Sequence, residues 1–409
     1  MTKNILISGA SIAGPALAYW LREHGCTVAV VERAPAPRPG GYKIDVRGRA
    51  MEVLERMGIA DEVRRHHTDM RGGAFLDRHG KTVVEMDADT VGFREPTDVE
   101  VLRGDLARIL REATEGVEYV YGDSITSLTE DAHGVAVTFE RSLPRRFDLV
   151  IGADGLHSTV RALAFGPEER FLRSLGHYVA IFSVPNMLEL DRWETIQAEK
   201  GRTLNVYSTR QDVQAKAAFM FAAPTLEYGR RDTARQQELL AEVFAPHGWI
   251  ASQLLAAMPA APDFYFDGMS VVEMEHWSTG RIALVGDAAY CASPASGQGT
   301  SLALVGAYVL ACELVAAGGD HKSAFVAYEE RMRHFVTVNQ KQASNIKRMV
   351  AGSRFMLWLN TTMMRYMRYL PGTAKIMEKV RAEIRDVSNA IELPETRPEL
   401  RTGSVRNAS

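Results

Sequence analysis

Residues 3–14 read KNILISGASIAG, and this stretch decides the fold. Lys3–Ser8 predicts a short buried strand, and the apolar helix that follows the glycine loop stops near Gly25. Thr27–Val31 predicts a second strand, with Glu32 at its end. In such a βαβ unit the glycines permit a tight turn, and the helix N-terminus faces the pyrophosphate of a dinucleotide. We therefore predict a Rossmann-like α/β domain at the start of the chain.

Two side chains near this turn indicate which dinucleotide it binds. Glu32 stands where a carboxylate accepts hydrogen bonds from ribose hydroxyls and repels a 2′-phosphate, which favours FAD or NAD over NADP. Ser11 replaces the middle glycine of the usual fingerprint, and its hydroxyl can donate to a phosphate. The alternative is an ordinary βαβ unit that binds nothing, because one glycine loop alone is weak evidence.

Two later segments favour FAD. The first is an apolar strand that ends in Asp154-Gly155, with Ser158 as the cap of the next helix. The second runs through Gly286-Asp287 and the loop Gly297–Gly299 to a small-residue helix that starts near Thr300. We expect the Asp287 carboxylate to bind the ribityl hydroxyls, and the loop N–H groups to approach the pyrimidine edge of the flavin. The dipole of the helix would stabilise negative charge on the reduced flavin.

With these motifs in this order and spacing, the chain resembles the class A flavoprotein monooxygenases, the family of p-hydroxybenzoate hydroxylase. The pattern is close to that of the tetracycline-inactivating monooxygenases. The resemblance implies a Rossmann-like FAD-binding domain that is discontinuous in sequence, a β-sheet substrate domain and a long C-terminal helix. The expected boundaries are 1–70, 101–167 and 271–320 for FAD binding, 71–100 and 168–270 for substrate binding, 321–391 for a helical segment, and 392–409 for a disordered tail.

The resemblance also carries cofactor roles to individual positions. Arg103 matches the arginine that reaches the FAD phosphate and ribityl region, and Asp45 matches a flavin-contacting position. Arg38 resembles the arginine that captures NADPH, and Asp154-Gly155 the turn with roles in both FAD and NAD(P)H binding. The expected FAD-binding residues are Gly9, Ser11, Ile12, Ala13, Gly14, Glu32, Arg33, Asp45, Arg103, Asp154, Gly155, Asp287, Gly297, Gln298, Gly299 and Thr300.

Three positions depart from the family pattern. Tyr290 stands where histidine is frequent, and Ser301 where asparagine is common. Gly306 replaces the usual aspartate before an alanine on the long helix. These departures leave FAD binding expected, but they leave open a degraded or repurposed member of the family.

The resemblance implies a single-component monooxygenase that uses FAD, NADPH or NADH, and O2. In this family a flavin C4a-hydroperoxide transfers oxygen to an electron-rich carbon, so no acid–base pair is obligatory and we assign no catalytic residue. The expected substrate is an aromatic or polycyclic small molecule of antibiotic, alkaloid or aromatic metabolism. The alternatives are a Baeyer–Villiger or epoxidising monooxygenase, a flavin reductase without oxygen transfer, and a non-catalytic FAD- or ligand-binding protein.

The substrate surface is expected on a second sheet, to which Thr203–Ser208 and Ala215–Phe221 contribute strands. Tyr178, Tyr207 and Phe219 are the candidate substrate contacts. The alternative for each of these rings is ordinary core packing.

Composition narrows the class of protein further. The 409 residues carry a formal net charge of −3, which gives no electrostatic reason to expect nucleic acid as a partner. The three cysteines form no C-x-x-C pair and no metal-ligand spacing, so we expect a reducing compartment and no metal. Charged residues interrupt the apolar stretch Phe355–Leu370, and the N-terminal apolar run is too short for a signal peptide. We expect a cytoplasmic monomer or homodimer that does not bind membranes.

Overall fold

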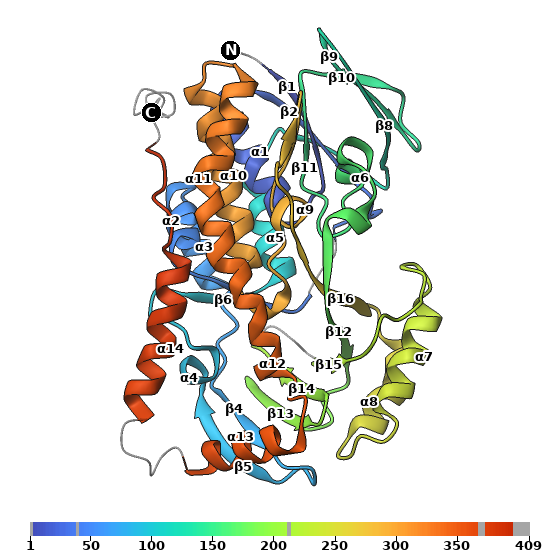
Figure 1. The fold of residues 1–409 in the computed structure, drawn as a ribbon, viewed down its shortest axis with the longest axis vertical. Coiled ribbons are helices and arrows are strands. Elements are labelled where there is room, and N and C mark those ends of the chain that lie inside the picture. The colour runs from blue at the N-terminus through green and yellow to red at the C-terminus, as the bar shows by residue number, and fades with distance from the viewer. Residues whose placement is uncertain (1–2, 38–40, 211–213, 367–372, 396–409) are drawn as a thin grey trace, which may run out of the picture.

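The structure is a computed structural model that describes residues 3–37, 41–210, 214–366 and 373–395 (Figure 1). Two large sheets organise the molecule. Figure 1 shows one in the upper half and the other in the lower half, with a pair of long helices along one side.

The six-stranded sheet carries the glycine motifs. Its strands are β1 (Asn4–Ser8), β2 (Thr27–Glu32), β7 (Glu118–Tyr121), β11 (Leu149–Gly152), β17 (Ser278–Thr279) and β18 (Ile282–Leu284). They take the order β17-β18-β11-β1-β2-β7, and every neighbouring pair is parallel except β17 with β18. The central strands are almost continuous apolar runs, as in other parallel sheets covered on both faces. Because the strands come from separate parts of the chain, the prediction of a discontinuous Rossmann-like domain is confirmed.

Helices share one apolar core with this sheet. They are α1 (Ala13–Glu23), α2 (Arg49–Arg56), α3 (Ala60–Arg65), α5 (Arg103–Glu112), α6 (Thr159–Phe165), α9 (Asp287–Tyr290), α10 (Gly299–Ala316) and α11 (His321–Lys341). Helix α10 is apolar on all sides because α1, α2 and α11 surround it. By length and composition α10 could cross a membrane, but 67% of it is buried inside the structure, as in the core helix of a globular protein.

The seven-stranded sheet has one face covered by two helices. Its strands are β4 (Gly72–Leu76), β5 (Thr82–Asp87), β12 (Leu172–Val184), β13 (Trp193–Glu199), β14 (Arg202–Ser208), β15 (Ala215–Ala222) and β16 (Tyr265–Val272). They take the order β16-β12-β15-β14-β13-β4-β5, and only β13 with β4 is parallel. One face packs on α7 (Thr233–Phe244) and α8 (Ala251–Ala257), and the strands expected near 203–208 and 215–221 are β14 and β15.

The opposite face of this sheet looks towards the glycine motifs. Val179 and Met269 on this face form a cluster with Ala295, which lies just before the loop Gly297–Gly299, and with Ile346. The alternation of side chains along each strand therefore separates a core face, under α7 and α8, from a second face that borders the candidate site.

The remaining strands and short helices lie outside the two large sheets. They are β3 (Lys43–Val46), β6 (Val99–Leu102), β8 (Ile125–Asp131), β9 (Gly134–Phe139), β10 (Arg145–Phe147), α4 (Ala88–Gly92), and the 3-10 helices η1 (Glu168–Arg170), η2 (Met258–Ala260), η3 (Pro294–Ser296) and η4 (Gln342–Asn345). Of these, β3 and β6 form an antiparallel pair, and β8, β9 and β10 form a separate three-stranded sheet.

The C-terminal region is helical. After α11, a helix of 21 residues, come α12 (Ile346–Met349), α13 (Arg354–Tyr366) and α14 (Thr373–Ser388), and α14 lies beside α11 (Figure 1). The tail predicted to begin at residue 392 needs a correction. The carbonyl oxygen of Pro394 accepts hydrogen bonds from Tyr308 Oη at 2.6 Å and Arg56 Nη1 at 2.7 Å, so residues 392–395 are fixed to the core. Residues 396–409 of the predicted tail lie outside the described residues.

Candidate functional site

The turn between β1 and α1 requires glycine for two different reasons. Gly9 has a φ of +108°, and a Cβ there would stand 2.4 Å from the carbonyl oxygen of Ala153. A Cβ at Gly14 would stand 1.9 Å from the carbonyl oxygen of Gly9. Both glycines therefore allow the backbone of α1 to begin directly against the ends of β1 and β11, with its free N–H groups at the turn.

Side chains from β2 and α5 hold this turn. The Glu32 carboxylate accepts hydrogen bonds from the backbone N–H groups of Ala10, at 2.9 Å, and Ala34, at 2.8 Å. Arg103, the first residue of α5, donates from Nη2 to Ser11 Oγ at 2.7 Å. A guanidinium, a hydroxyl and the N-terminus of a helix thus meet at one point, which is a donor set suited to a phosphate.

Asp154 acts as a local cap. Its carboxylate accepts from Ser158 Oγ at 2.5 Å and from the backbone N–H of Thr159 at 2.8 Å, and burial raises its pKa. The predicted cap is confirmed as well, since Ser158 Oγ accepts from the N–H of Arg161. Gly155 has a φ of +82°, and nothing lies within 4 Å of a Cβ built on it, so this turn is open on its outer side.

Asp287 begins α9, close to the loop at the start of α10. Burial raises the pKa of its carboxyl, while Arg103 acts in the opposite direction. A Cβ at Gly299 would meet Asp287 Oδ1 at 3.8 Å, and Gly297 has a φ of +65°. Gln298 is 2% exposed and Thr300 is half-buried in the first turn of α10. The structure therefore brings Asp287 and the loop residues together.

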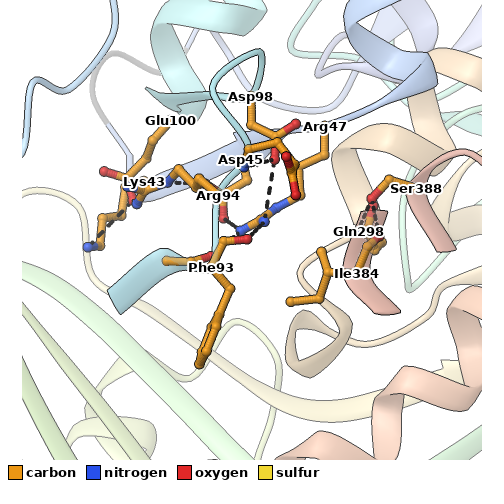
Figure 2. A network of polar contacts seen from close by, with 12 residues as sticks. Lys43, Asp45, Arg47, Phe93, Arg94, Asp98, Glu100, Gln298, Ile384 and Ser388 are labelled. Atoms are coloured by element: carbon orange, nitrogen blue, oxygen red, sulfur yellow. Dashed lines mark hydrogen bonds and ion pairs between the residues drawn. The ribbon is translucent and has the colours of Figure 1, made fainter. Parts of the chain in front are cut away.

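Asp45 lies between two arginines (Figure 2). Its carboxylate accepts from Arg47 at 2.8 Å and from Arg94 at 2.9 Å. Burial raises the pKa of Asp45, but the two guanidinium groups lower it more, so the net shift is downward. The arginine pair therefore keeps Asp45 ionised.

The same network reaches the seven-stranded sheet. Arg94 also pairs with Glu100, and Lys43 Nζ lies 2.9 Å from Glu194 Oε2 and 3.6 Å from Glu100 Oε2. Burial lowers the pKa of Lys43, but Glu194 and Glu100 raise it, and the net shift is upward. Because Glu194 lies on β13, these ion pairs join the β3–β6 pair to the second sheet. The sequence pattern did not indicate them, since the charges come from four separate segments.

Two more charged groups, one buried and one half-buried, were not assigned roles from the sequence. Arg161 is fully buried, and it donates to the carbonyl oxygens of Ala288, at 2.8 Å, and Leu156, at 2.6 Å, which joins the Asp154 turn to α9. His157 lies between Glu168, at 2.9 Å from Nδ1, and Asp267, at 3.2 Å from Nε2. Burial alone would lower the pKa of His157, but the hydrogen bonds to Asp267 and Glu168 raise it to about 9. Arg161 follows Asp154-Gly155 closely in the sequence, whereas only the fold brings Asp267 to His157.

The three candidate substrate contacts fall on different faces of the second sheet. Tyr178 and Phe219 belong to the cluster under α7 and α8, as the alternative of core packing expects. Tyr207 lies on the opposite face, where its hydroxyl accepts from the N–H of Lys43 at 3.3 Å and Lys43 Nζ lies 4.9 Å from its ring centroid. Tyr207 is thus the candidate that borders the β3 segment.

A further aromatic pair, which the sequence did not suggest, lies beside Arg103. The rings of Tyr42 and Tyr265 are 5.9 Å apart, and Arg103 lies 5.9 Å from the centroid of Tyr42. The Tyr265 hydroxyl donates to Asp267 at 3.3 Å. Burial raises the pKa of Tyr265 well above its usual value, so this phenol stays protonated.

The remaining predicted positions differ in their surroundings. Ile12 and Ala13 are buried at the start of α1, and Arg33 is exposed beyond β2. Arg38 lies outside the described residues. Ser301, one of the departures from the family pattern, is fully buried, and its hydroxyl has no hydrogen-bond partner within the described part of the chain.

The residues present fit FAD. A phosphate-binding donor set at Ser11 and Arg103 lies at the end of the six-stranded sheet, and Glu32 offers further acceptor positions for a ribose. Near Asp287, the amide oxygen of Gln298 is buried and unpaired among the described residues, as expected for a group that meets a ligand.

Comparisons with known proteins agree with this geometry. Residues 2–343 match the family described as FAD binding domain. A flavin-dependent monooxygenase from Legionella longbeachae is 38% identical over 97% of this chain and 99% of its own length. An uncharacterised protein of Mycobacterium tuberculosis is 51% identical over 83% of this chain and 92% of its own length.

Solved structures show the same relationship. The tetracycline destructase Tet(55) is 40% identical, with a TM-score of 0.84 over 97% of this chain and 99% of its own. Tet(51) is 35% identical, with a TM-score of 0.85 over 97% of this chain and 100% of its own. Klebsiella pneumoniae HpxO, solved with FAD and uric acid, is 22% identical with a TM-score of 0.71 over 93% of this chain and 96% of its own, which shows the shared fold. The chain therefore belongs to the FAD-binding domain family and, within it, to the class A flavin-dependent monooxygenases, close to the tetracycline destructases.

Proposed function

We propose that this monooxygenase hydroxylates an aromatic or polycyclic small molecule with NADPH or NADH and O2. The observation that carries the proposal is the similarity to Tet(55) and Tet(51) over 97% of the chain, which includes both sheets and the C-terminal helices. Tetracycline is itself polycyclic and phenolic, so a related substrate of this class fits the same architecture.

In this proposal FAD lies along the carboxyl ends of β1 and β11, as ligands do in open α/β sheets. The turn Gly9–Gly14 binds the pyrophosphate together with Ser11 and Arg103, and Glu32 binds the adenosine ribose. Asp287 accepts from the ribityl hydroxyls, and the loop Gly297–Gly299 meets the flavin ring. When bound and reduced, FAD supplies the activation of O2 and the transfer of one oxygen atom.

The protein contributes binding, orientation and exclusion of water. The second face of the seven-stranded sheet presents Met220, Ile181 and Tyr265 towards Ala295 in the loop region, and an aromatic substrate between these surfaces is oriented mainly by apolar contact. The Tyr265 hydroxyl can donate a hydrogen bond to a substrate only if it gives up its hydrogen bond to Asp267. Tyr207 lies at the other end of this surface, beside Lys43. No residue of the chain is required as a general acid or base.

The reductant is part of the proposal. We place NAD(P)H contacts at Arg38 and at the Asp154-Gly155 turn, which is open on its outer side. Arg38→Ala is expected to raise the KM for NADPH several-fold with flavin content unchanged. An unaltered KM in that variant would remove Arg38 from the binding site.

The experiment that tests the function is steady-state NADPH oxidation by the FAD-loaded protein, in air, with a panel of polycyclic phenols that includes a tetracycline. Oxidation that accelerates with one class of compound, together with a product 16 mass units heavier or a fragment of it, supports the proposal. Equal rates with and without every compound, with all O2 recovered as hydrogen peroxide, contradict it.

A further inference from the structure

The last turn of α14 contacts the loop on which we place the flavin (Figure 2). Ser388, the final residue of α14, accepts a hydrogen bond at Oγ from Nε2 of Gln298, with an N···O distance of 2.9 Å. Both side chains are 2% exposed, so solvent does not reach this bond. The contact ties the C-terminal end of the chain to the loop Gly297–Gly299, across 90 residues of sequence.

The neighbouring hydrogen bond decides which way the Gln298 amide faces. Ser388 Oγ donates its one proton to the carbonyl oxygen of Ile384, at 2.8 Å. Towards Gln298 the hydroxyl can therefore only accept, and the amide must present its NH2 group to it. The amide oxygen Oε1 then points away from Ser388, where it is buried and has no hydrogen-bond partner among the described residues. A buried acceptor without a donor is unfavourable, and none of the described residues supplies a donor to Oε1.

Backbone contacts show that the position of Ser388 is closely defined. Gly48 has a φ of +50°, and a Cβ there would stand 2.8 Å from both Cβ and the carbonyl oxygen of Ser388. Gly48 also donates its N–H to Asp98 at 3.3 Å, in the network around Asp45. The end of α14 therefore lies between the β3–α2 connection and the loop Gly297–Gly299.

Contacts elsewhere in the C-terminal region hold the end of α14 in this position. Arg385 pairs with Glu95 at 3.4 Å, and Ile391, three residues after the end of the helix, is buried in the main core. Beyond it the hydrogen bonds to Pro394 fasten the chain to α2 and α10. The Ser388 hydroxyl thus has attachments on both sides along the chain.

We propose that Ser388 is a positioning residue for the flavin: it orients Gln298 so that Oε1 accepts a hydrogen bond from FAD. The donor is the N–H of the isoalloxazine ring or a hydroxyl of the ribityl chain, since these are the donors at that end of the cofactor. The inference rests on the proposed placement of FAD at the loop Gly297–Gly299. The sequence did not indicate that Ser388 contacts Gln298, because nothing around Ser388 resembles a cofactor motif.

The test is a double-mutant cycle read out by FAD binding to the apoprotein. Ser388→Ala is expected to raise the Kd for FAD about 3- to 10-fold, the range of one net hydrogen bond. Gln298→Ala is expected to raise it by a similar factor, and Ser388→Ala is expected to add nothing further in that background. A ring N–H donor is also expected to shift the visible absorption and the reduction potential of the bound flavin in Ser388→Ala, whereas a ribityl donor leaves both unchanged.

A control variant on the same helix tells whether Ser388→Ala acts by misplacing Gln298 or by loosening the packing of α14. Arg385→Ala removes the ion pair with Glu95 without touching the loop, so it is expected to lower Tm while the Kd for FAD stays within about twofold. The proposal is overturned if Ser388→Ala binds FAD as the wild type does, or if its effect persists undiminished in the Gln298→Ala background. Failure of the wild type to bind FAD would instead contradict the proposed function.

Discussion

A Cβ atom at position 306 would lie 1.9 Å from the hydroxyl oxygen of Tyr290, so Gly306 and Tyr290 occupy complementary space. The Tyr290 hydroxyl lies 2.9 Å from that of Tyr328, which donates to the carbonyl oxygen of Leu284 at 3.1 Å. Both positions depart from the family pattern, which often has histidine at the first and aspartate at the second. The geometry couples the two positions, because the Tyr290 side chain occupies the space that a side chain at position 306 would need.

Gly306→Ala is expected to destabilise the protein by about 1–3 kcal/mol, because the new methyl group overpacks a closed core. The measurement is the free energy of unfolding by urea. Gly306→Ala should be partly rescued by Tyr290→Phe, which removes the oxygen that the methyl group would strike. Additive effects of the two substitutions would show that the contact is relieved in some other way.

Asp287→Ala is expected to weaken FAD binding roughly 10- to 100-fold, because hydrogen bonds to a charged acceptor are worth about 1.5–3 kcal/mol. The measurement is flavin retained after gel filtration, followed by titration of the apoprotein. Asp320→Ala, which removes the exposed cap of α11, is the matched control and should leave FAD binding unchanged. An unchanged flavin content in Asp287→Ala would contradict the assignment.

His157 predicts a specific dependence of stability on pH. Its folded pKa of about 9 lies above its usual value of 6.5, so the folded state binds the proton more tightly. The contribution is therefore fully present below pH 6.5 and is lost as the pH rises towards 9. Wild-type Tm should fall over this window, and His157→Gln should lower Tm at pH 6.5 and flatten the profile. A slope that is identical in the variant would show that His157 does not carry this dependence.

Glu194→Ala should be strongly destabilising, by about 3–5 kcal/mol, because it leaves Lys43 with a poorer partner in a buried network. Replacement of both members by apolar residues, Lys43→Met with Glu194→Leu, should recover much of the loss. Glu273→Ala breaks an ion pair with Arg173 that is more than half exposed, and it should change stability by less than about 0.5 kcal/mol. Equal effects of Glu194→Ala and Glu273→Ala would contradict the importance of burial here.

The sequence was most informative where backbone geometry itself is the requirement. Gly9 and Gly14 have neighbours that exclude any Cβ, and Ser158 caps its helix through an oxygen that few residue types provide. Such constraints are local, so the N-terminal unit, the Asp154 turn and the start of α10 could all be predicted within a few residues.

Contacts between distant segments could not be predicted in this way. Lys43 and Glu194, His157 and Asp267, and Gln298 and Ser388 meet only because the two sheets and α14 are packed together. The alternation of side chains along a strand also does not tell which face of the sheet borders the candidate site. Tyr178 and Tyr207 therefore looked equivalent in sequence, although one lies under α7 and the other beside Lys43.

We propose that this chain binds FAD and uses it to insert oxygen into an aromatic or polycyclic substrate. The most direct measurement is mass spectrometry of products formed by the FAD-loaded protein with NADPH under 18O2, with the panel of polycyclic phenols as substrates. We expect one labelled oxygen atom per product molecule from 18O2 and none from labelled water. A protein that takes up no FAD, or one that converts all the 18O2 to hydrogen peroxide with every compound, would contradict it.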